Sequence, residues 1–172
     1  DPRKIHIARG AYDLIWVGSH FTHLDARLWW EFLEVFRDAL SPGGLFIFTT
    51  HGRIPYRNIV GGSWAYGTTG RRRTLLLHDY ERTGFGYVRY ANSDGYYGIS
   101  LQSQAWVLNQ VTKHGGLRVV HFAEQAWHRH QDCFACTREH SPQYRADSST
   151  IPLWKYLKHL LGEKRRDFKP VW

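Results

Sequence analysis

The chain has 172 residues, of which 42% are hydrophobic, so it is long enough for one domain with a sizeable core. It contains no apolar run of the ~18 residues that a membrane span needs, so no transmembrane helix is expected. A net charge of +8 leaves two interpretations open, an anionic partner such as nucleic acid or a basic protein without one. Cys133 and Cys136 are too few for a disulfide framework, which predicts a cytoplasmic location.

A strand–helix–strand unit comes first along the chain. Tyr12–Val17 is a short apolar run with β-branched and aromatic residues, which predicts a strand buried on both faces. Thr22 stands three residues before Asp25, a capping-box spacing that predicts the start of a helix. Residues 41–44 (Ser-Pro-Gly-Gly) end that helix, and Leu45–Thr49 is a second apolar strand. The short connections predict a right-handed βαβ unit whose two strands are parallel.

Polar residues follow both strands, at the edge where open parallel sheets bind ligands. The first strand is followed by Gly18, Ser19, His20 and Phe21, and the second by Thr50, His51 and Gly52. We expect these two groups to lie side by side, because the carboxyl ends of parallel strands share one edge of the sheet. For Ser19 and Thr22 the alternative is simple helix capping, and for His51 it is a loop histidine bonded to the backbone.

Residues 53–90 are rich in Gly, Tyr and Arg and lack a clear core pattern, apart from a short helix expected at 75–81. A stretch this long after a core strand is usually functional, so we expect a lid or an acceptor-binding segment. Arg71–Arg73 could bind a phosphate group, or they could be a solvated run of charge.

The remaining core elements form a closing group. A helix is expected over 103–114, with Ser103 as its cap and Gly115-Gly116 at its end. Strands are expected at 117–123 and 131–138. A short His-rich turn joins them, which predicts an antiparallel pair.

Five potential metal ligands cluster around this turn, namely His128, His130, Asp132, Cys133 and Cys136. A three-residue spacing on a strand puts the two cysteines on opposite faces, and no second ligand pair completes a zinc pattern. We therefore expect a structural turn and no metal.

The composition changes after residue 140. Residues 141–149 are a polar linker, and Pro152–Leu161 has helical spacing with basic flanks. This helix could bind a partner or an anionic surface, or it could be a solvated extension. The expected organisation is one domain over 1–140, with 53–90 as an insertion or lid, and a linker with a basic C-terminal helix over 141–172.

The ordered series of signals resembles the class I S-adenosylmethionine-dependent methyltransferase family. The segments that carry the resemblance are YDLIWVGSHFTHLD, the following helix with its LSPGG turn, LFIFTTHG, YGISL, GLRVVHFAE and HQDCFACTRE. They cover roughly residues 11–140 and are similar to the second half of the family's domain. The resemblance implies an α/β fold, a partial Rossmann-like methyltransferase sheet with parallel strands and a closing antiparallel hairpin.

The resemblance also implies transfer of a methyl group from S-adenosylmethionine to an unidentified O, N or C nucleophile. The sulfonium is already activated, so the protein mainly aligns the reactants, with a base only if the acceptor must lose a proton. The residues that would contact the cofactor are Gly18, Ser19, His20 and Phe21. His51 is the first candidate on the acceptor side or as the base, because histidine titrates near neutral pH, and Tyr97 is the second.

Two expected parts of the family's domain are missing. No G-x-G-x-x-G loop precedes Tyr12, and no acidic residue for the ribose hydroxyls follows such a loop. Methionine is absent, even at position 1. These features predict a fragment that binds cofactor poorly alone. Its strand at Tyr12 would be an exposed edge that pairs with a missing N-terminal half, a partner chain or a second copy.

A second function remains open. A non-catalytic basic module with this architecture would contact nucleic acid or another polyanion through Arg71–Arg73 and the basic C-terminal segment. Salt-dependent binding would separate this module from the enzyme.

Overall fold

The computed structural model describes residues 6–91, 95, 97–114 and 116–139. The chain divides into two units, Asp1–Ser141 and Pro142–Trp172. The predicted linker and the predicted helix at Pro152–Leu161 lie outside the described residues, so everything that follows concerns the first unit.

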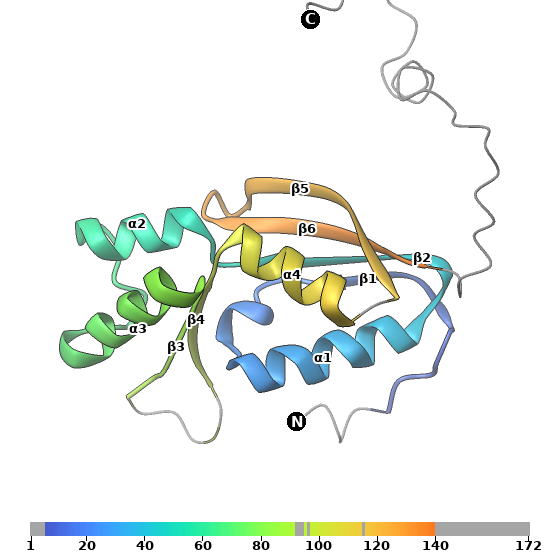
Figure 1. The fold of residues 1–172 in the computed structure, drawn as a ribbon, viewed down its shortest axis with the longest axis horizontal. Coiled ribbons are helices and arrows are strands. Elements are labelled where there is room, and N and C mark those ends of the chain that lie inside the picture. Colours follow the sequence, from blue (N-terminus) through green and yellow to red (C-terminus); the bar gives the residue numbers. More distant parts are fainter. Residues whose placement is uncertain (1–5, 92–94, 96, 115, 140–172) are drawn as a thin grey trace, which may run out of the picture. The chain divides into compact units, whose positions relative to one another are not determined.

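The predicted βαβ unit is present (Figure 1). Strand β1 (Tyr12–Val17) pairs in parallel with β2 (Leu40–Thr50), and helix α1 (Ala26–Ala39) connects them. Strand β2 begins directly after the helix, so residues 41–44 belong to the strand rather than to a separate turn. The pairing register shifts between Tyr12 and Leu14, which absorbs this irregular start.

The closing hairpin is also confirmed. Strands β5 (Leu117–Trp127) and β6 (Gln131–Arg138) are antiparallel, and β6 pairs with β2, giving the sheet order β1-β2-β6-β5. Helix α4 (Gln104–His114) precedes the hairpin. Ser103 caps it as predicted, because its Oγ accepts a hydrogen bond from the Trp106 N–H at 3.1 Å. The result is a mixed α/β sheet with parallel and antiparallel pairs.

One face of the sheet carries the core. Helices α1 and α4 both pack there, and the indoles of Trp29 and Trp106 meet edge to face at 5.1 Å. The largest fully buried aromatic side chains are Trp29, Phe21, Phe46, Phe48 and Phe134. Burial of such rings contributes roughly 1.5–3 kcal/mol each.

The prediction that β1 is buried on both faces is wrong. Among the described residues β1 pairs only with β2, so it is an edge strand. Tyr12, Leu14 and Trp16 are 42%, 60% and 46% exposed. They alternate along the strand and therefore point to one face, whereas Ile15 and Val17 pack against the core. The expectation of an exposed edge at this strand is thus confirmed for the described residues.

The predicted capping box is wrong as well. Asp25, not Thr22, caps α1, since its Oδ1 accepts a hydrogen bond from the Leu28 N–H at 2.8 Å. The Thr22 hydroxyl instead donates to the Ser19 carbonyl at 2.7 Å. Thr22 belongs to a short 3-10 turn, η2 (Phe21–His23), which separates β1 from α1.

The insertion after β2 is more regular than predicted. It forms helices α2 (Arg53–Gly61) and α3 (Gly70–Thr83), and strand β3 (Phe85–Arg89), which pairs antiparallel with β4 (Gly98–Gln102). The short helix expected at 75–81 lies within α3. A second core holds these elements together and consists of Ile59, Tyr66, Leu76, Val88, Ile99 and Leu101. None of the helices in the described part has the length and apolar content that crossing a membrane requires.

Replacing the cap of α1 should destabilise the fold. Asp25→Ala should lower the free energy of unfolding by about 1 kcal/mol, because the Leu28 N–H loses its acceptor. Asp25→Asn keeps a side-chain oxygen at this position and should cost less. Urea denaturation followed by circular dichroism measures both, and equal losses in the two variants would contradict the cap assignment.

Candidate functional site

The two groups of strand-end residues do lie side by side. The Ser19 N–H donates to Thr49 Oγ1 at 2.8 Å, which ties the loop after β1 to the end of β2. Gln131, at the start of β6, accepts hydrogen bonds from Thr49 Oγ1 at 2.6 Å and from Ser19 Oγ at 3.1 Å. Ser19 has a φ of 57°, a left-handed conformation that is uncommon for a non-glycine residue. Ser19 therefore shapes the loop and does not cap α1.

The other residues assigned to the cofactor lie in different environments. Gly18 is exposed, and a side chain there would meet the Trp16 indole at 3.3 Å. His20 is half-buried with its ring edge-on to Phe32 at 4.3 Å, and its Nε2 is buried without a hydrogen-bond partner. Burial, then the nearby His23, lower the pKa of His20. The Phe21 ring is fully buried in the core, so its cofactor role stays a prediction.

Gln102 joins three segments beneath this edge. Its Oε1 accepts from the His51 N–H at 3.1 Å, and its own N–H donates to the His51 carbonyl at 2.8 Å. Its Nε2 donates to the Phe21 carbonyl at 3.0 Å and to Ser100 Oγ at 2.6 Å. The side chain is 1% exposed and uses both ends of its amide. The loops after β1 and β2 are thereby fixed to β4.

His51 is the most enclosed of the predicted site residues. It is 3% exposed, and its Nδ1 is buried without a hydrogen-bond partner. Its ring lies 5.0 Å from that of Tyr66, 5.6 Å from His130 and 6.4 Å from His23. We call His23, His51, His130, Tyr66, Tyr90 and Tyr97 the imidazole–tyrosine cluster. It combines residues after β1 and β2, from the insertion, and from the β5–β6 turn.

His51 is neutral at physiological pH. Burial is the main cause that lowers its pKa to about 3. The neighbouring His130 and His23 act in the same direction, and a hydrogen bond with the Ser100 backbone acts in the opposite direction. An imidazole whose conjugate acid is this strong holds an abstracted proton poorly. His51 is therefore better suited to hydrogen-bond a ligand through Nδ1 than to serve as a general base.

Tyr97 lies on His23 rather than on His51. The Tyr97 and His23 rings stack at 4.5 Å, and Tyr97 is 53% exposed. His23 Nδ1 lies 2.8 Å from the Gly98 carbonyl and 3.3 Å from the Tyr90 hydroxyl. His23 was not among the site residues predicted from the sequence, because the helix was expected to begin at Thr22. The second histidine of SHFTHL, in the loop after a core strand, was the signal that could have found it.

Asp132 occupies the other side of the β2 end. A side chain at Gly52 would overlap its carboxyl group, so glycine leaves room for the carboxyl in this position. Its Oδ1 accepts from the Gln125 N–H at 3.1 Å, and burial raises its pKa to about 6. Nearby, Arg53 and Glu124 form a bidentate ion pair at 2.6 and 2.9 Å.

The possible ligands around the β5–β6 turn do not converge. Within the described residues, no group of three or more His, Cys, Asp or Glu side chains is placed to hold a metal ion. Both cysteines are free, with Cys136 buried and Cys133 partly buried, and burial raises both thiol pKa values.

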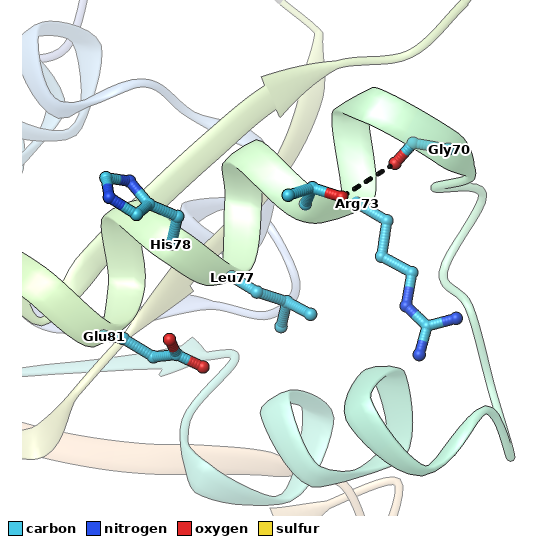
Figure 2. Close-up of a pocket in the computed structure, with 6 residues that line it drawn as sticks. Gly70, Arg73, Leu77, His78 and Glu81 are labelled. Carbon is cyan, nitrogen blue, oxygen red and sulfur yellow. Dashed lines mark hydrogen bonds between the residues drawn. The ribbon is translucent and has the colours of Figure 1, made fainter.

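The arginine run lies on the insertion, at the start of α3. Arg71 and Arg72 are exposed, while Arg73 donates to the Val60 carbonyl at 3.0 Å. A hollow of about 480 Å³ lies beside this helix, lined by Gly70, Arg73, Thr74, Leu77, His78 and Glu81. Figure 2 shows Arg73 and Leu77 directed toward the neighbouring helix. The hollow includes no residue of the imidazole–tyrosine cluster.

Solved structures identify the architecture. A S-adenosylmethionine-dependent methyltransferase from Methanosarcina mazei matches with a TM-score of 0.54 at 11% identity, over 81% of this chain and 65% of that one. The described part of the chain has a class I methyltransferase-like fold. A putative S-adenosylmethionine-dependent methyltransferase from Listeria monocytogenes matches with a TM-score of 0.53 at 15% identity, over 81% and 67%. No protein-family model and no curated protein matches the sequence.

A third match was solved with ligands bound. It is the 1,6-didemethyltoxoflavin-N1-methyltransferase of Burkholderia thailandensis, with 1,6-didemethyltoxoflavin and S-adenosylhomocysteine. Its TM-score is 0.52 at 8% identity, over 81% of this chain and 48% of that one. The chain thus spans between about half and two thirds of the methyltransferases that it matches.

The residues present do not by themselves fit a complete cofactor. Gly18 is exposed, and Nε2 of His20 is buried without a hydrogen-bond partner. The Ser19 hydroxyl is already bonded to Gln131, and the Phe21 ring is in the core. The sequence supplies no glycine-rich loop that would let a backbone approach the cofactor. We expect these residues to contribute one side of a cofactor site at most.

The carboxyl of Asp132 should make stability fall as pH rises. Its folded-state pKa of about 6 exceeds the ordinary value of 3.8, so the folded protein binds this proton more tightly than the unfolded chain does. The protonated group stabilises below about pH 4, and this contribution is lost as pH rises to about 6. At about pH 7.5, Asp132→Asn should therefore stabilise the protein by about 1 to 2 kcal/mol.

Denaturant unfolding of both proteins at the two pH values measures this effect. The asparagine keeps an oxygen for the Gln125 N–H, so the wild type and the variant should differ little in free energy of unfolding at about pH 4. A variant that is less stable at the higher pH would contradict the raised pKa.

Proposed function

We propose that this chain is the acceptor-side part of a S-adenosylmethionine-dependent methyltransferase that acts on an unidentified acceptor within a larger chain. The observation that carries the proposal is the imidazole–tyrosine cluster at the carboxyl ends of β1 and β2, in a methyltransferase-like sheet. Ligands of open α/β sheets bind at this edge. Free cysteines on β6 agree with the reducing, cytoplasmic setting that we propose.

The roles divide by position. His51, with an unpartnered buried nitrogen, would hydrogen-bond the acceptor, and Tyr97 would cover it from the exposed side. Gly18 and His20 would face the cofactor, while Ser19 holds their loop in place. Bound S-adenosylmethionine would supply the activated methyl group. The residues of this chain would contribute alignment, which is a large part of catalysis between two bound reactants.

The free edge of β1 suggests where the rest of the domain attaches. Tyr12, Leu14 and Trp16 expose apolar surface beside a strand edge that has no partner in the described residues. Exposed edges of this kind pair readily with another strand. We propose that the cofactor-binding half of the domain covers this edge, and a homodimer formed through β1 is the alternative outcome.

Calorimetric titration of S-adenosylhomocysteine tests the proposal. The 172-residue chain should bind weakly, because it carries one side of the site, whereas a longer form extended before Asp1 should bind with a micromolar Kd. Micromolar binding by the 172-residue chain would show that it builds the pocket alone. If neither the 172-residue chain nor the longer form binds S-adenosylhomocysteine, the methyltransferase proposal is contradicted.

The second candidate function is a non-catalytic module that binds nucleic acid or another polyanion. Arg71 and Arg72, exposed in the first turn of α3 without an acidic neighbour in that turn, favour it. The net charge of +8 has the sign that such a partner requires.

This module predicts salt-dependent binding to single-stranded RNA in a fluorescence anisotropy assay. Arg71→Gln with Arg72→Gln should weaken binding and flatten the slope of log K against log salt by about one to two units, since each lost phosphate contact reduces it. Arg27→Gln, an exposed arginine on α1, serves as the matched control. An unchanged slope in the double variant would exclude this arginine pair as the contact.

A further inference from the structure

Two histidines of the cluster, His51 and His23, differ in how exposed they are to solvent. His51 is 3% exposed, and the lone pair of its Nδ1 is enclosed by Tyr66 and by two other imidazoles. His23 is half-buried and lies under a tyrosine that is itself 53% exposed. A proton taken up by His23 therefore has a route to solvent that His51 lacks.

The hydrogen bond at Gly98 fixes the tautomer of His23. A carbonyl oxygen only accepts, so the short contact of 2.8 Å requires the proton of the neutral ring to be on Nδ1. The lone pair is then on Nε2. A backbone carbonyl that holds Nδ1–H is a common way of orienting a functional histidine and making its other nitrogen available.

The position of this carbonyl is itself fixed. Gly98 pairs with Arg89 in the β3–β4 hairpin, and a side chain at 98 would overlap the Val88 carbonyl and lie 2.7 Å from the Tyr87 ring. Only glycine fits, so the hairpin register sets where the carbonyl lies. On the other side, the 3-10 turn holds the His23 backbone, whose N–H donates to the His20 carbonyl at 3.1 Å.

The neighbours of His23 keep its ring neutral. The titratable groups that face it are His20, His51, Tyr90 and Tyr97. Burial lowers the pKa of His23, and the hydrogen bond to Gly98 partly restores it. Burial raises the pKa of Tyr90 to about 12, so its hydroxyl stays protonated near neutral pH.

The geometry points to His23 as the residue that removes a proton from the acceptor, an inference that rests on the proposed methyl transfer. The O–H or N–H bond of the acceptor breaks, its proton passes to Nε2 of His23, and the electron pair stays on the heteroatom that receives the methyl group. The acceptor class in this inference is a compound with a hydroxyl or an N–H group. His51 is a positioning residue in this arrangement.

The tautomer is the first test and needs no substrate. Long-range ¹H–¹⁵N spectra of the 172-residue chain should show His23 with its proton on Nδ1 and a pKa below 6.5. Diethyl pyrocarbonate, which acylates a neutral and accessible imidazole nitrogen, should modify His23 before His51. A proton on Nε2, or an unreactive His23, would overturn the inference.

The second test separates chemistry from structure. His23→Asn places an amide N–H where Nδ1 lies, so it can still donate to Gly98, but it has no basic nitrogen. In the intact protein, with tritiated methyl from S-adenosylmethionine and a small-molecule extract as the acceptor source, this variant should lose about 100-fold or more in rate. It should also lose the acid limb of the pH profile, while binding of S-adenosylhomocysteine is unchanged.

His121→Gln, on exposed β5, is the matched control and should leave the rate unchanged. A wild-type protein that transfers no methyl group would contradict the proposed function. The tautomer of His23 can be measured in that case too, because its measurement needs no activity. An active wild type with an equally active His23→Asn variant would overturn only the role of His23.

Discussion

The buried amide of Gln102 is the interaction on which the candidate site depends. Its side chain is hydrogen-bonded to Phe21 in the loop after β1 and to His51 in the loop after β2. It is also hydrogen-bonded to Ser100, which lies on the same strand as Gln102. A buried amide that is fully paired is stabilising and specific, whereas loss of one partner leaves a costly unpaired group. The insertion and the central sheet meet at this side chain, so the geometry of the cluster follows from its hydrogen bonds.

The two cores explain why the site lies where it does. Helices α1 and α4 pack on one face of the sheet, and the insertion builds a separate core around Leu76 and Ile99. The polar residues between these cores can approach one another without being displaced by apolar side chains. The other face of β1 remains open in the described residues, which agrees with a chain that spans only part of the methyltransferases it matches.

Local patterns predicted much of the fold. Hydrophobic periodicity identified the strands and helices of the βαβ unit and the closing hairpin, and Ser103 was identified as a cap because capping is a short-range interaction. The Thr22 prediction was wrong because Asp25, three residues later, competes for the same role. The prediction that β1 is buried on both faces was wrong because burial depends on which elements cover a strand. Hydrophobic periodicity does not contain that information.

The site was predicted in outline only. Strand order brought Ser19 and His51 to one edge, as expected from parallel pairing. The position of His23 after β1 was visible in the sequence, but its contact with Gly98 was not, because Gly98 is distant in the chain and belongs to a hairpin with no clear pattern. The pKa of His51 was equally hidden, since it depends on enclosure by residues from several elements.

The contact between Gly52 and Asp132 has a consequence for how this protein can change over evolution. The two residues share a volume that holds either the carboxyl group or a side chain at 52, but not both. A side chain at 52 therefore requires either a displaced carboxyl group or a smaller residue at 132. The two positions should covary among homologues, and a glycine after FTTH together with an aspartate at the start of β6 gives a paired marker for finding them.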